Sequence, residues 1–416
     1  MLKNYLKIAW KVLQRRKFFT FISLFGISFT LMVLMVATSF ADYILGPHMP
    51  EVKTDRMLYV NRLKVTGEGY TMNTNPGFYF LDKYVRPLKT PQDITIYSSE
   101  FAYNAYVDNR KLPLGVRFTD ASLWNVLDFV FTEGGPFNKA EVESIARVAV
   151  ITEATRENYF GEGKKAVGQY IEVDRTKYKV VGVVKNIAAT RTNTYADVWV
   201  PYTNLKEDYR KPEFGGSFEA ILLARSPEDM AVVKAEFYNV IKDVPIPPTS
   251  NGVHFKNLQV HADTLVESFV RGVGRVDGEV NLLLFSMFVI LGVLFFMLLP
   301  TINLVNINIS RIMERTSEIG VRKAFGASSS TLVVQFLVEN IILTLIGGLI
   351  GLVGAQGVLM LINDSGLIPY SDLSINPTIF VFSLLICIVF GILSGVYPAY
   401  KMSKLPAVAA LKGGIV

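Results

Sequence analysis

The sequence contains few of the residues from which catalytic and metal sites are usually built. It has one cysteine, Cys387, and three histidines, at positions 48, 254 and 261. A single cysteine cannot form a disulfide within the chain, and the spacing of the histidines matches no zinc motif. We therefore expect no metal ion, and a fold that is stabilised by its hydrophobic core rather than by cross-links.

Nucleotide-binding and nucleophile motifs are also missing from the sequence. A phosphate-binding loop would end in Gly-Lys-Ser or Gly-Lys-Thr, but Gly163-Lys164 is followed by Lys165 and has no glycine five residues earlier. No Gly-x-Ser-x-Gly element is present either. We predict that the chain is not an enzyme and that it binds no cofactor of its own.

Long hydrophobic runs are abundant instead. Hydrophobic residues make up 50% of the chain. Four uncharged runs of about 22 residues are each long enough, at 1.5 Å per residue, to cross a hydrocarbon core of about 30 Å. We expect them to be transmembrane helices: 18–41, 281–302, 341–362 and 377–398. No cleavage pattern follows the first run, so we interpret it as a retained anchor, with a signal peptide as the alternative.

The distribution of lysine and arginine predicts the topology. Six basic residues lie in 1–17, four in 307–330 and three in the tail 399–416, whereas the loop 363–376 has none. Basic residues favour the cytoplasmic side, so both termini and the 307–330 loop are expected in the cytoplasm. Residues 42–280 are then periplasmic or extracellular. The positive net charge serves topology and anionic lipid, and nucleic-acid binding is not required to explain it.

Two segments at the membrane surface have the patterns of amphipathic helices. Residues 1–17 place apolar side chains on one face, and the loop from Asn308 onward does the same. In that loop Arg311, Glu314, Arg315 and Glu318 supply charges of both signs. The alternatives are an unstructured positive flank and a solvated loop that only sets topology.

The segment 42–280 is predicted to be a mixed α/β domain. Alternating apolar residues indicate strands, and 218–260 is typical of a strand–helix–strand unit, with Ser226 as the N-cap of its helix. We expect two α/β parts, about 50–115 and 216–262, and an inserted, mostly β subdomain at about 116–215. The expected fold class is thus an α-helical membrane protein, with four transmembrane helices and a large extracytoplasmic α/β domain between helices 1 and 2.

Glycines mark two further places. Gly347, Gly351 and Gly354 lie in the third run at spacings that let two helices approach closely in lipid, either within one subunit or between two. Gly272, Gly274 and Gly278 precede the second run and indicate a flexible joint or a helix end. Glu339, with Gln335 and Asn340, is expected near the inner interface, where the third helix enters the membrane.

The run Glu314–Asn340 (ERTSEIGVRKAFGASSSTLVVQFLVEN) resembles a motif of the MacB/FtsX-type permeases of ABC transporters. Their pattern is approximately E-I-G-x-R-K-A-x-G-A followed by a hydrophobic-Glu pair. The chain meets it with Glu318, Ile319, Gly320, Arg322, Lys323, Ala324, Gly326, Ala327 and Glu339. Tyr397-Pro398-Ala399 and PAVAAL at 406–411 are similar to the closing motif of the family. Segments 144–168, 178–184 and 197–201 resemble its periplasmic core domain.

The resemblance implies a dimer, either of this chain or with a related permease, in the bacterial inner membrane. It also implies that the loop after the second helix is a coupling helix that contacts a cytoplasmic ABC ATPase. Because only 17 residues precede the first run, we expect that ATPase, with its ATP and Mg, on a separate chain. The residues expected to couple to it are Arg311, Glu314, Arg315, Glu318, Gly320, Arg322, Lys323 and Gly326.

Three functions are compatible with this resemblance. The first is export of a peptide, an antibiotic or a lipoprotein-type substrate, in which ATPase closure moves the periplasmic domains and a periplasmic adaptor can take part. The second is an FtsX-like transducer that regulates a cell-wall hydrolase. The third is a sensor partner of a kinase. The large domain at 42–280 favours the first.

Overall fold

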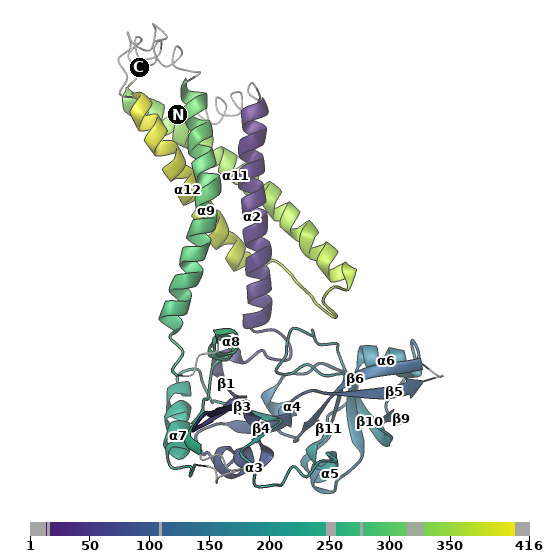
Figure 1. Ribbon diagram of the computed structural model, residues 1–416. Coiled ribbons are helices and arrows are strands. Elements are labelled where there is room, and N and C mark those ends of the chain that lie inside the picture. The colour runs from purple at the N-terminus through teal and green to yellow at the C-terminus, as the bar shows by residue number, and fades with distance from the viewer. Residues whose placement is uncertain are drawn as a thin grey trace. The chain divides into compact units, whose positions relative to one another are not determined.

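The computed structural model describes residues 14, 17–107, 110–246, 255–274, 278–313, 321, 325 and 328–403. The chain forms two compact units (Figure 1). The helical unit comprises Met1–Asp42, Leu283–Leu367 and Leu373–Val416, and the α/β unit comprises Tyr43–Leu282 and Ile368–Asp372. The chain therefore passes between the two units at four places, one at an end of each long helix.

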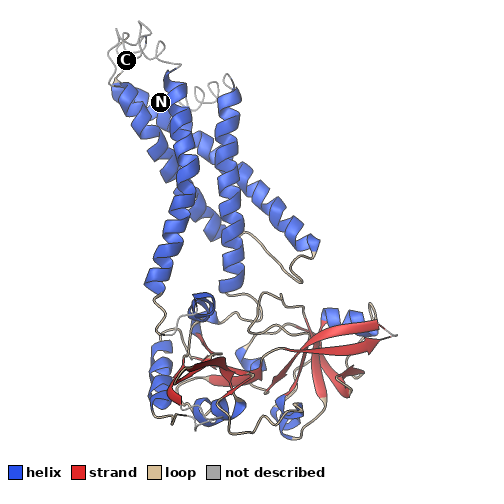
Figure 2. Cartoon of the chain, viewed as in Figure 1, coloured by secondary structure: helices blue, strands red, loops and turns tan. Residues whose placement is uncertain are grey.

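Four long helices are described in or at the ends of the helical unit, and all strands belong to the other unit (Figure 2). The helices are α2 (Lys17–Leu45), α9 (Leu282–Met313), α11 (Ser329–Ser365) and α12 (Pro377–Ser403). Val293 of α9 packs against one apolar core that is formed by side chains of α2, α11 and α12. The buried residues of this core are Ile27, Leu31, Leu34, Met35, Leu343, Ala355 and Cys387.

Two described segments, Lys17–Leu45 and Val333–Ser365, are long and apolar enough to cross a membrane by length and composition. The described apolar segments of α9 and α12 are shorter, Leu282–Phe296 and Phe380–Leu393. Two of the four expected spans thus meet the criterion directly, and the other two stay predictions.

Two expectations about the ends of these helices need comment. A separate short helix was expected from Asn308 onward, but α9 continues through Asn308 to Met313. The reason is that no glycine or proline follows Pro300 in this stretch to interrupt the backbone hydrogen bonds. The predicted helix at 1–17 lies outside the described residues, apart from Gln14 and Lys17.

The α/β unit contains two β-sheets in its described residues. The larger has ten strands, of which eight follow one another in the order β1 (Met57–Val60), β13 (Phe218–Leu223), β4 (Asp93–Ser98), β6 (Arg110–Thr119), β11 (Val198–Pro201), β8 (Val148–Thr152), β10 (Thr176–Val184) and β7 (Phe131–Gly134). β5 (Phe101–Val107) pairs with β6, and β9 (Tyr170–Val173) with β10. The smaller has the order β12 (Gly215–Gly216), β3 (Tyr70–Pro76), β2 (Leu63–Gly67) and β14 (Phe255–Val260).

Short helices and turns connect these strands. The α-helices are α3 (Phe78–Phe80), α4 (Leu123–Val126), α5 (Lys139–Glu143), α6 (Glu153–Phe160), α7 (Met230–Lys242) and α8 (Leu265–Gly274). The remaining helical turns are η1 (Thr54–Arg56), η2 (Leu81–Val85) and η3 (Tyr202–Asn204).

The large sheet is buried on both faces. On β1, Leu58 and Val60 pack into one core, whereas Met57 and Tyr59 pack into another. Successive side chains of a strand point to opposite faces, so a strand between two cores must be apolar at every position. This explains the uninterrupted apolar sequences of β1 and β11. β8 and β13 follow the same rule except at one polar residue each, Thr152 and Glu219.

The expected division into two α/β parts and an inserted subdomain stays a prediction, but the strands of these parts are not in separate sheets. One sheet runs through both, because β4 of the first part pairs with β6, which in turn pairs with β11. The two strands of the predicted strand–helix–strand unit, β13 and β14, lie in different sheets. Helix α7 also begins at Met230, three residues later than its predicted first position, because tight turns precede it: the Asp229 and Met230 N–H groups donate to Ser226 and Pro227.

Candidate functional site

Most residues that the sequence predicts to contact an ATPase lie outside the described residues. This holds for Glu314, Arg315, Glu318, Gly320, Arg322, Lys323 and Gly326. Only the backbone of Arg311 is described, near the C-terminal end of α9. The predicted coupling role of these eight residues therefore stays a prediction.

The three glycines of α11 face α2 of the same chain. A Cβ atom at Gly347 would lie 2.7 Å from Ile27 Cγ2, and one at Gly351 would lie 2.8 Å from the Ser28 carbonyl oxygen. At Gly354 it would lie 3.0 Å from Met32 Sδ. Small residues at this spacing allow two helix backbones to approach closely. Contact within one subunit, the first of the two alternatives, is thus present for these glycines. Contact between two subunits stays a prediction.

Glu339 is buried inside the helical unit. Its side chain is 2% exposed, and the Gln335 Nε2 group donates to its Oε1 over 3.1 Å, one helical turn away. Asn340, beside it, is also buried. Polar groups in an apolar helix require such partners, because an unsatisfied group there is costly.

A buried arginine caps the end of α2. Arg191 donates from Nη2 to the Gly46 carbonyl oxygen (2.9 Å) and from Nη1 to that of Ile44 (3.5 Å). The last carbonyl groups of a helix have no partner within it, and a guanidinium supplies donors with a favourable charge. Arg191 also forms an ion pair with Glu51 at 3.4 Å, and the two side chains are 2% and 1% exposed. The end of α2 is thus attached to the interior of the α/β unit.

A second buried arginine precedes α9. Arg271, on α8, binds Asp263 with two parallel contacts, Nε to Oδ2 at 2.5 Å and Nη2 to Oδ1 at 3.0 Å. Its Nη1 donates to the Gly278 carbonyl oxygen over 2.6 Å. The described part of α8 ends at Gly274, and residues 275–277 lie outside the described residues, so both interpretations of these glycines stay predictions. The segment that leads into α9 is therefore held by a buried ion pair.

Tyr59 connects the two ion pairs. Its backbone N–H donates to the Asp263 carbonyl oxygen (2.7 Å), and its carbonyl accepts from the Asp263 N–H (3.0 Å). Its hydroxyl donates to Glu51 Oε2 over 3.3 Å. Burial and the nearby Glu51 carboxylate raise the pKa of Tyr59 well above its usual value, so the hydroxyl stays a donor. We call these residues the junction network: Glu51, Tyr59, Arg191, Asp263 and Arg271.

The loop between α11 and α12 also contacts the α/β unit. Residues 368–372 belong to that unit. The Ala189 N–H donates to the Pro369 carbonyl oxygen (3.4 Å), and the Asp372 N–H donates to the Tyr43 hydroxyl (3.2 Å).

Sequence reasoning did not find the junction network. Glu51 and Arg191 are 140 residues apart and obey no motif spacing. The one available signal was the presence of charged residues next to apolar strands. Exposed turns commonly have charged residues in the same position, so this signal does not identify a buried ion pair.

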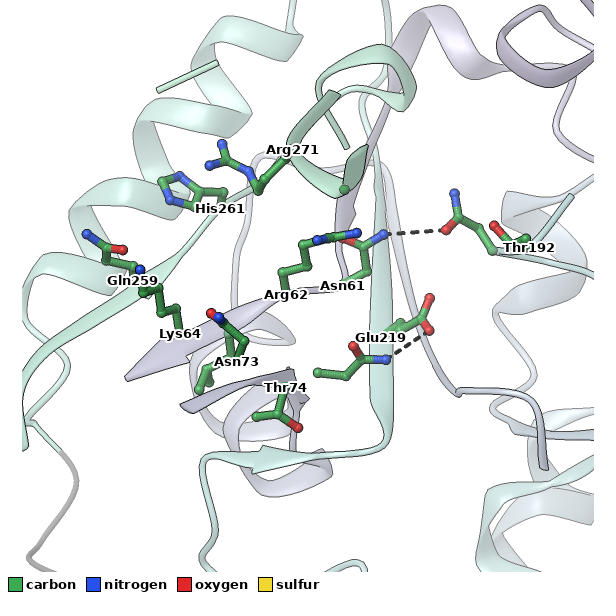
Figure 3. Close-up of a pocket in the computed structure, with 14 residues that line it drawn as sticks. Asn61, Arg62, Lys64, Asn73, Thr74, Thr192, Glu219, Gln259, His261 and Arg271 are labelled. Carbon is green, nitrogen blue, oxygen red and sulfur yellow. Dashed lines mark hydrogen bonds between the residues drawn. The ribbon is translucent and has the colours of Figure 1, made fainter. Parts of the chain in front are cut away.

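A polar cavity of about 510 Å³ lies beside this network (Figure 3). Asn61 and Arg62, between β1 and β2, line it together with residues of β3, β14 and α8. A neighbouring cavity of about 260 Å³ shares Asn61, Arg62, Thr192, Asn193 and Gly272 with it and reaches Arg191 and Glu51. The wall is rich in amide side chains: Asn61, Asn73, Asn75, Asn193 and Gln259.

The cavity is held open by internal hydrogen bonds. The Asn61 amide donates to Ser268 Oγ (2.9 Å) and to Asn193 Oδ1 (3.4 Å), and the Asn75 amide donates to Glu219 Oε1 (3.2 Å). Glu219 is almost fully buried, which raises the pKa of its carboxyl, while the Arg117 guanidinium acts in the opposite direction.

These features define an α/β domain in which buried ion pairs hold the end of α2 and the segment before α9. The family model described as MacB-like periplasmic core domain matches residues 20–240, and that described as FtsX-like permease C-terminal matches residues 288–407. The chain therefore belongs to the family of MacB/FtsX-type permeases, and it is a membrane protein with a periplasmic α/β domain.

Named relatives agree with this assignment. The chain is 29% identical over 289 residues to the pyoverdine export ATP-binding/permease protein PvdT of Pseudomonas syringae, with 69% of this chain and 41% of that protein covered. It is 25% identical to the uncharacterized ABC transporter permease YknZ of Bacillus subtilis, with 69% and 67% covered. The match thus spans less than half of the length of PvdT. The periplasmic region of MacB from Actinobacillus actinomycetemcomitans has 12% identity and a TM-score of 0.38, with 54% and 95% covered.

Proposed function

We propose that the chain is the transmembrane subunit of an ABC transporter. A separate cytoplasmic ATPase binds ATP and Mg, and its hydrolysis cycle drives movements of the periplasmic domain of this chain. The transported molecule is a peptide, an antibiotic or a lipoprotein-type substrate, which leaves the cell with or without a periplasmic adaptor. Support comes from the two family matches and from a relative that is named for pyoverdine export.

The observation that carries the proposal is the junction network. Through Tyr59 it ties the end of α2 and the segment before α9 to one strand, β1, which lies at the edge of the large sheet. Buried ion pairs with several hydrogen bonds are costly to break. When either helix end is displaced, the ion pairs therefore stay formed and β1 moves with it. This is the property that a protein needs if it relays force between a membrane helix and a soluble domain.

In this proposal α2, α9, α11 and α12 all span the inner membrane, and both termini lie in the cytoplasm. The exposed apolar side chains of α9 support it, since Phe288 and Phe295 are 68% and 71% exposed. Such a surface requires lipid or another helix. A second copy of this chain, or a related permease, supplies the other half of the transporter.

Stimulation of the ATPase tests the coupling loop. The chain is purified with the ATPase subunit that accompanies it and is placed in nanodiscs. We expect the double change Arg322→Glu/Lys323→Glu to abolish the part of ATP hydrolysis that depends on this chain. The reason is that two acidic side chains would replace the two basic ones that are expected to contact the ATPase. The control is Arg175→Glu/Lys177→Glu, the same charge reversal on an exposed hairpin of the α/β unit.

Two results would contradict the proposal. One is that no ATPase accompanies the chain during purification. The other is that both double variants have the same effect on ATP hydrolysis. Export measured in cells with and without the chain then separates a transporter from a regulator of a cell-wall hydrolase.

A further inference from the structure

One face of helix α8 exposes apolar side chains. Phe269 and Val273 are 37% and 74% exposed. Val266 and Val270 are half-buried and lie on the same side, because residues three and four apart are neighbours on a helix. We call these four residues the outer face of α8. A helix of a soluble domain ordinarily turns its apolar face toward the core instead.

The opposite face of α8 is buried and mostly polar. Leu265, Ser268 and Arg271 are its buried residues. Arg271 is held by the Asp263 carboxylate, and Ser268 Oγ accepts from the Asn61 amide over 2.9 Å. The polar groups of this face thus have their partners inside the α/β unit.

Glu267 fixes the same orientation. Its carboxylate forms an ion pair with Lys234 of α7 at 2.6 Å and accepts from the Thr264 N–H over 2.7 Å at the start of α8. Rotating α8 to bury its outer face would break this pair and the buried pair of Arg271, which is costly. The outer face is therefore not a misplaced core face, and it needs a cover from outside the domain.

The chain tethers α8 to the start of α9. Arg271 Nη1 donates to the Gly278 carbonyl oxygen over 2.6 Å, and α9 begins at Leu282. Four residues of chain span at most about 14 Å. At the start of α9, Leu283 and Leu284 are 72% and 53% exposed, so apolar surface resumes within this reach of α8.

The outer face also adjoins the end of α2. Phe269 and Val273 line the cavity of about 260 Å³ together with Ile44 and Leu45, the last residues of α2. This helix is long and apolar enough to cross a membrane. The outer face thus lies beside the end of one membrane helix and on a short tether to the next.

We propose that the outer face of α8 is embedded in the outer-leaflet interface of the membrane, with Phe269 and Val273 among the lipid chains. Lipid is the cover that the ends of α2 and α9 bring to this place, and the outer face carries no charge that would oppose it. The inference rests on the proposed topology, in which both helices span the membrane. It adds a role for α8: because Arg271 binds Asp263, which pairs with Tyr59, the membrane surface holds β1 through this helix.

Spin-label EPR of the full chain in nanodiscs tests the inference. In a Cys387→Ser background, a nitroxide at Val273→Cys should keep its access to oxygen, which concentrates in lipid, and lose its access to a water-soluble nickel chelate. The matched control is Val232→Cys on α7, which is 54% exposed in the same unit and should remain open to the chelate. Phe288→Cys on α9 reports the topology and should behave as a lipid-facing position.

The two reagents distinguish the possible covers of the outer face. Equal chelate access at positions 273 and 232 places the face in water and overturns the inference. Exclusion of both reagents at 273 also overturns it, in favour of a protein cover such as a second copy of the chain. If the label at 288 meets the chelate, the proposed topology fails as well, whereas lipid access at 288 confines the failure to α8.

A charge on the outer face gives an independent test. With the label at Phe269→Cys, the further change Val273→Glu should raise chelate access, because a carboxylate draws the outer face out of the lipid. Val232→Glu, with the same label, adds the same charge on α7 and should leave chelate access at 269 unchanged. An unchanged label in the Val273→Glu variant, or an equal rise in both variants, overturns the inference.

Discussion

At the scale of single residues, the buried ion pair of Arg271 and Asp263 is expected to contribute strongly to the free energy of unfolding. Arg271→Gln would leave the Asp263 carboxylate buried and without its guanidinium, a change that costs about 3–5 kcal/mol. We expect the free energy of unfolding to fall by that amount, as followed by denaturant unfolding with the fluorescence of the buried Trp199. Lys256→Gln is the matched control, since its ion pair with Glu68 has side chains 63% and 71% exposed. That change should cost less than about 1 kcal/mol. Equal losses in the two variants would contradict the buried pair.

The partly buried carboxyl of Asp197 should make the stability of the fold depend on pH. Burial raises the pKa of the Asp197 carboxyl, in spite of hydrogen bonds from the Gly115 N–H and the Tyr195 hydroxyl. The folded state therefore holds this proton to a higher pH than the unfolded state, whose Asp pKa is about 3.9. As the pH rises from about 4 through the raised pKa, the folded state loses stability from this group, and above it the loss is complete.

The Asp197→Asn variant isolates that contribution. Its free energy of unfolding minus that of the parent chain should increase across this window and then stay level at higher pH. Denaturant unfolding at a series of pH values measures the difference. If the two pH profiles run parallel, Asp197 does not have a raised pKa.

At the scale of elements, the contact between α11 and α2 depends on glycine. Replacing a helical glycine by alanine ordinarily stabilises a helix by about 0.5–1 kcal/mol. Gly357→Ala should follow this rule, because a Cβ atom there meets nothing within 4 Å. Gly351→Ala should instead lower the unfolding temperature in detergent, because its Cβ atom would lie 2.8 Å from the Ser28 carbonyl oxygen and 3.1 Å from Leu31 Cβ. If both variants gain stability, the two helices are not packed as described.

Elements whose pattern is local were predictable from the sequence. β4 and β9 coincide with the short strand-like sequences Asp93–Ser98 and Tyr170–Val173, which can be recognised without the rest of the chain. The turn at Asp174 and Arg175 joins β9 and β10 with two positive φ angles, as a tight hairpin requires. The start of α7 was wrong because Ser226 begins a tight turn there rather than the helix. Local propensity does not distinguish these two uses of a serine.

Non-local arrangements were not predictable. The order of strands places β13 between β1 and β4, and no pattern within either segment specifies that neighbour. The polar cavity likewise gathers Arg62, Asn193, Glu219 and Gln259, which are brought together only by the two sheets and α8. The apolar runs indicate which residues are buried, but they leave open which core each face meets.

At the scale of the whole molecule, the proposed topology predicts opposite exposure of two positions. In a Cys387→Ser background, a membrane-impermeant maleimide should label Tyr170→Cys in spheroplasts, because this side chain is 59% exposed in the periplasmic domain. It should label Arg322→Cys only after permeabilisation, since basic loops stay in the cytoplasm. Labelling of both positions from the same side would remove the basis for a relay across the membrane.

The strand order also has a consequence for biosynthesis. β1 is completed at Val60, but its neighbour in the large sheet, β13, begins only at Phe218. The segment between them must be made and translocated before the first strand can pair, and such distant pairings form slowly. Meanwhile the apolar side chains of β1 remain uncovered, so we expect the nascent domain to be prone to aggregation until β13 has been translocated.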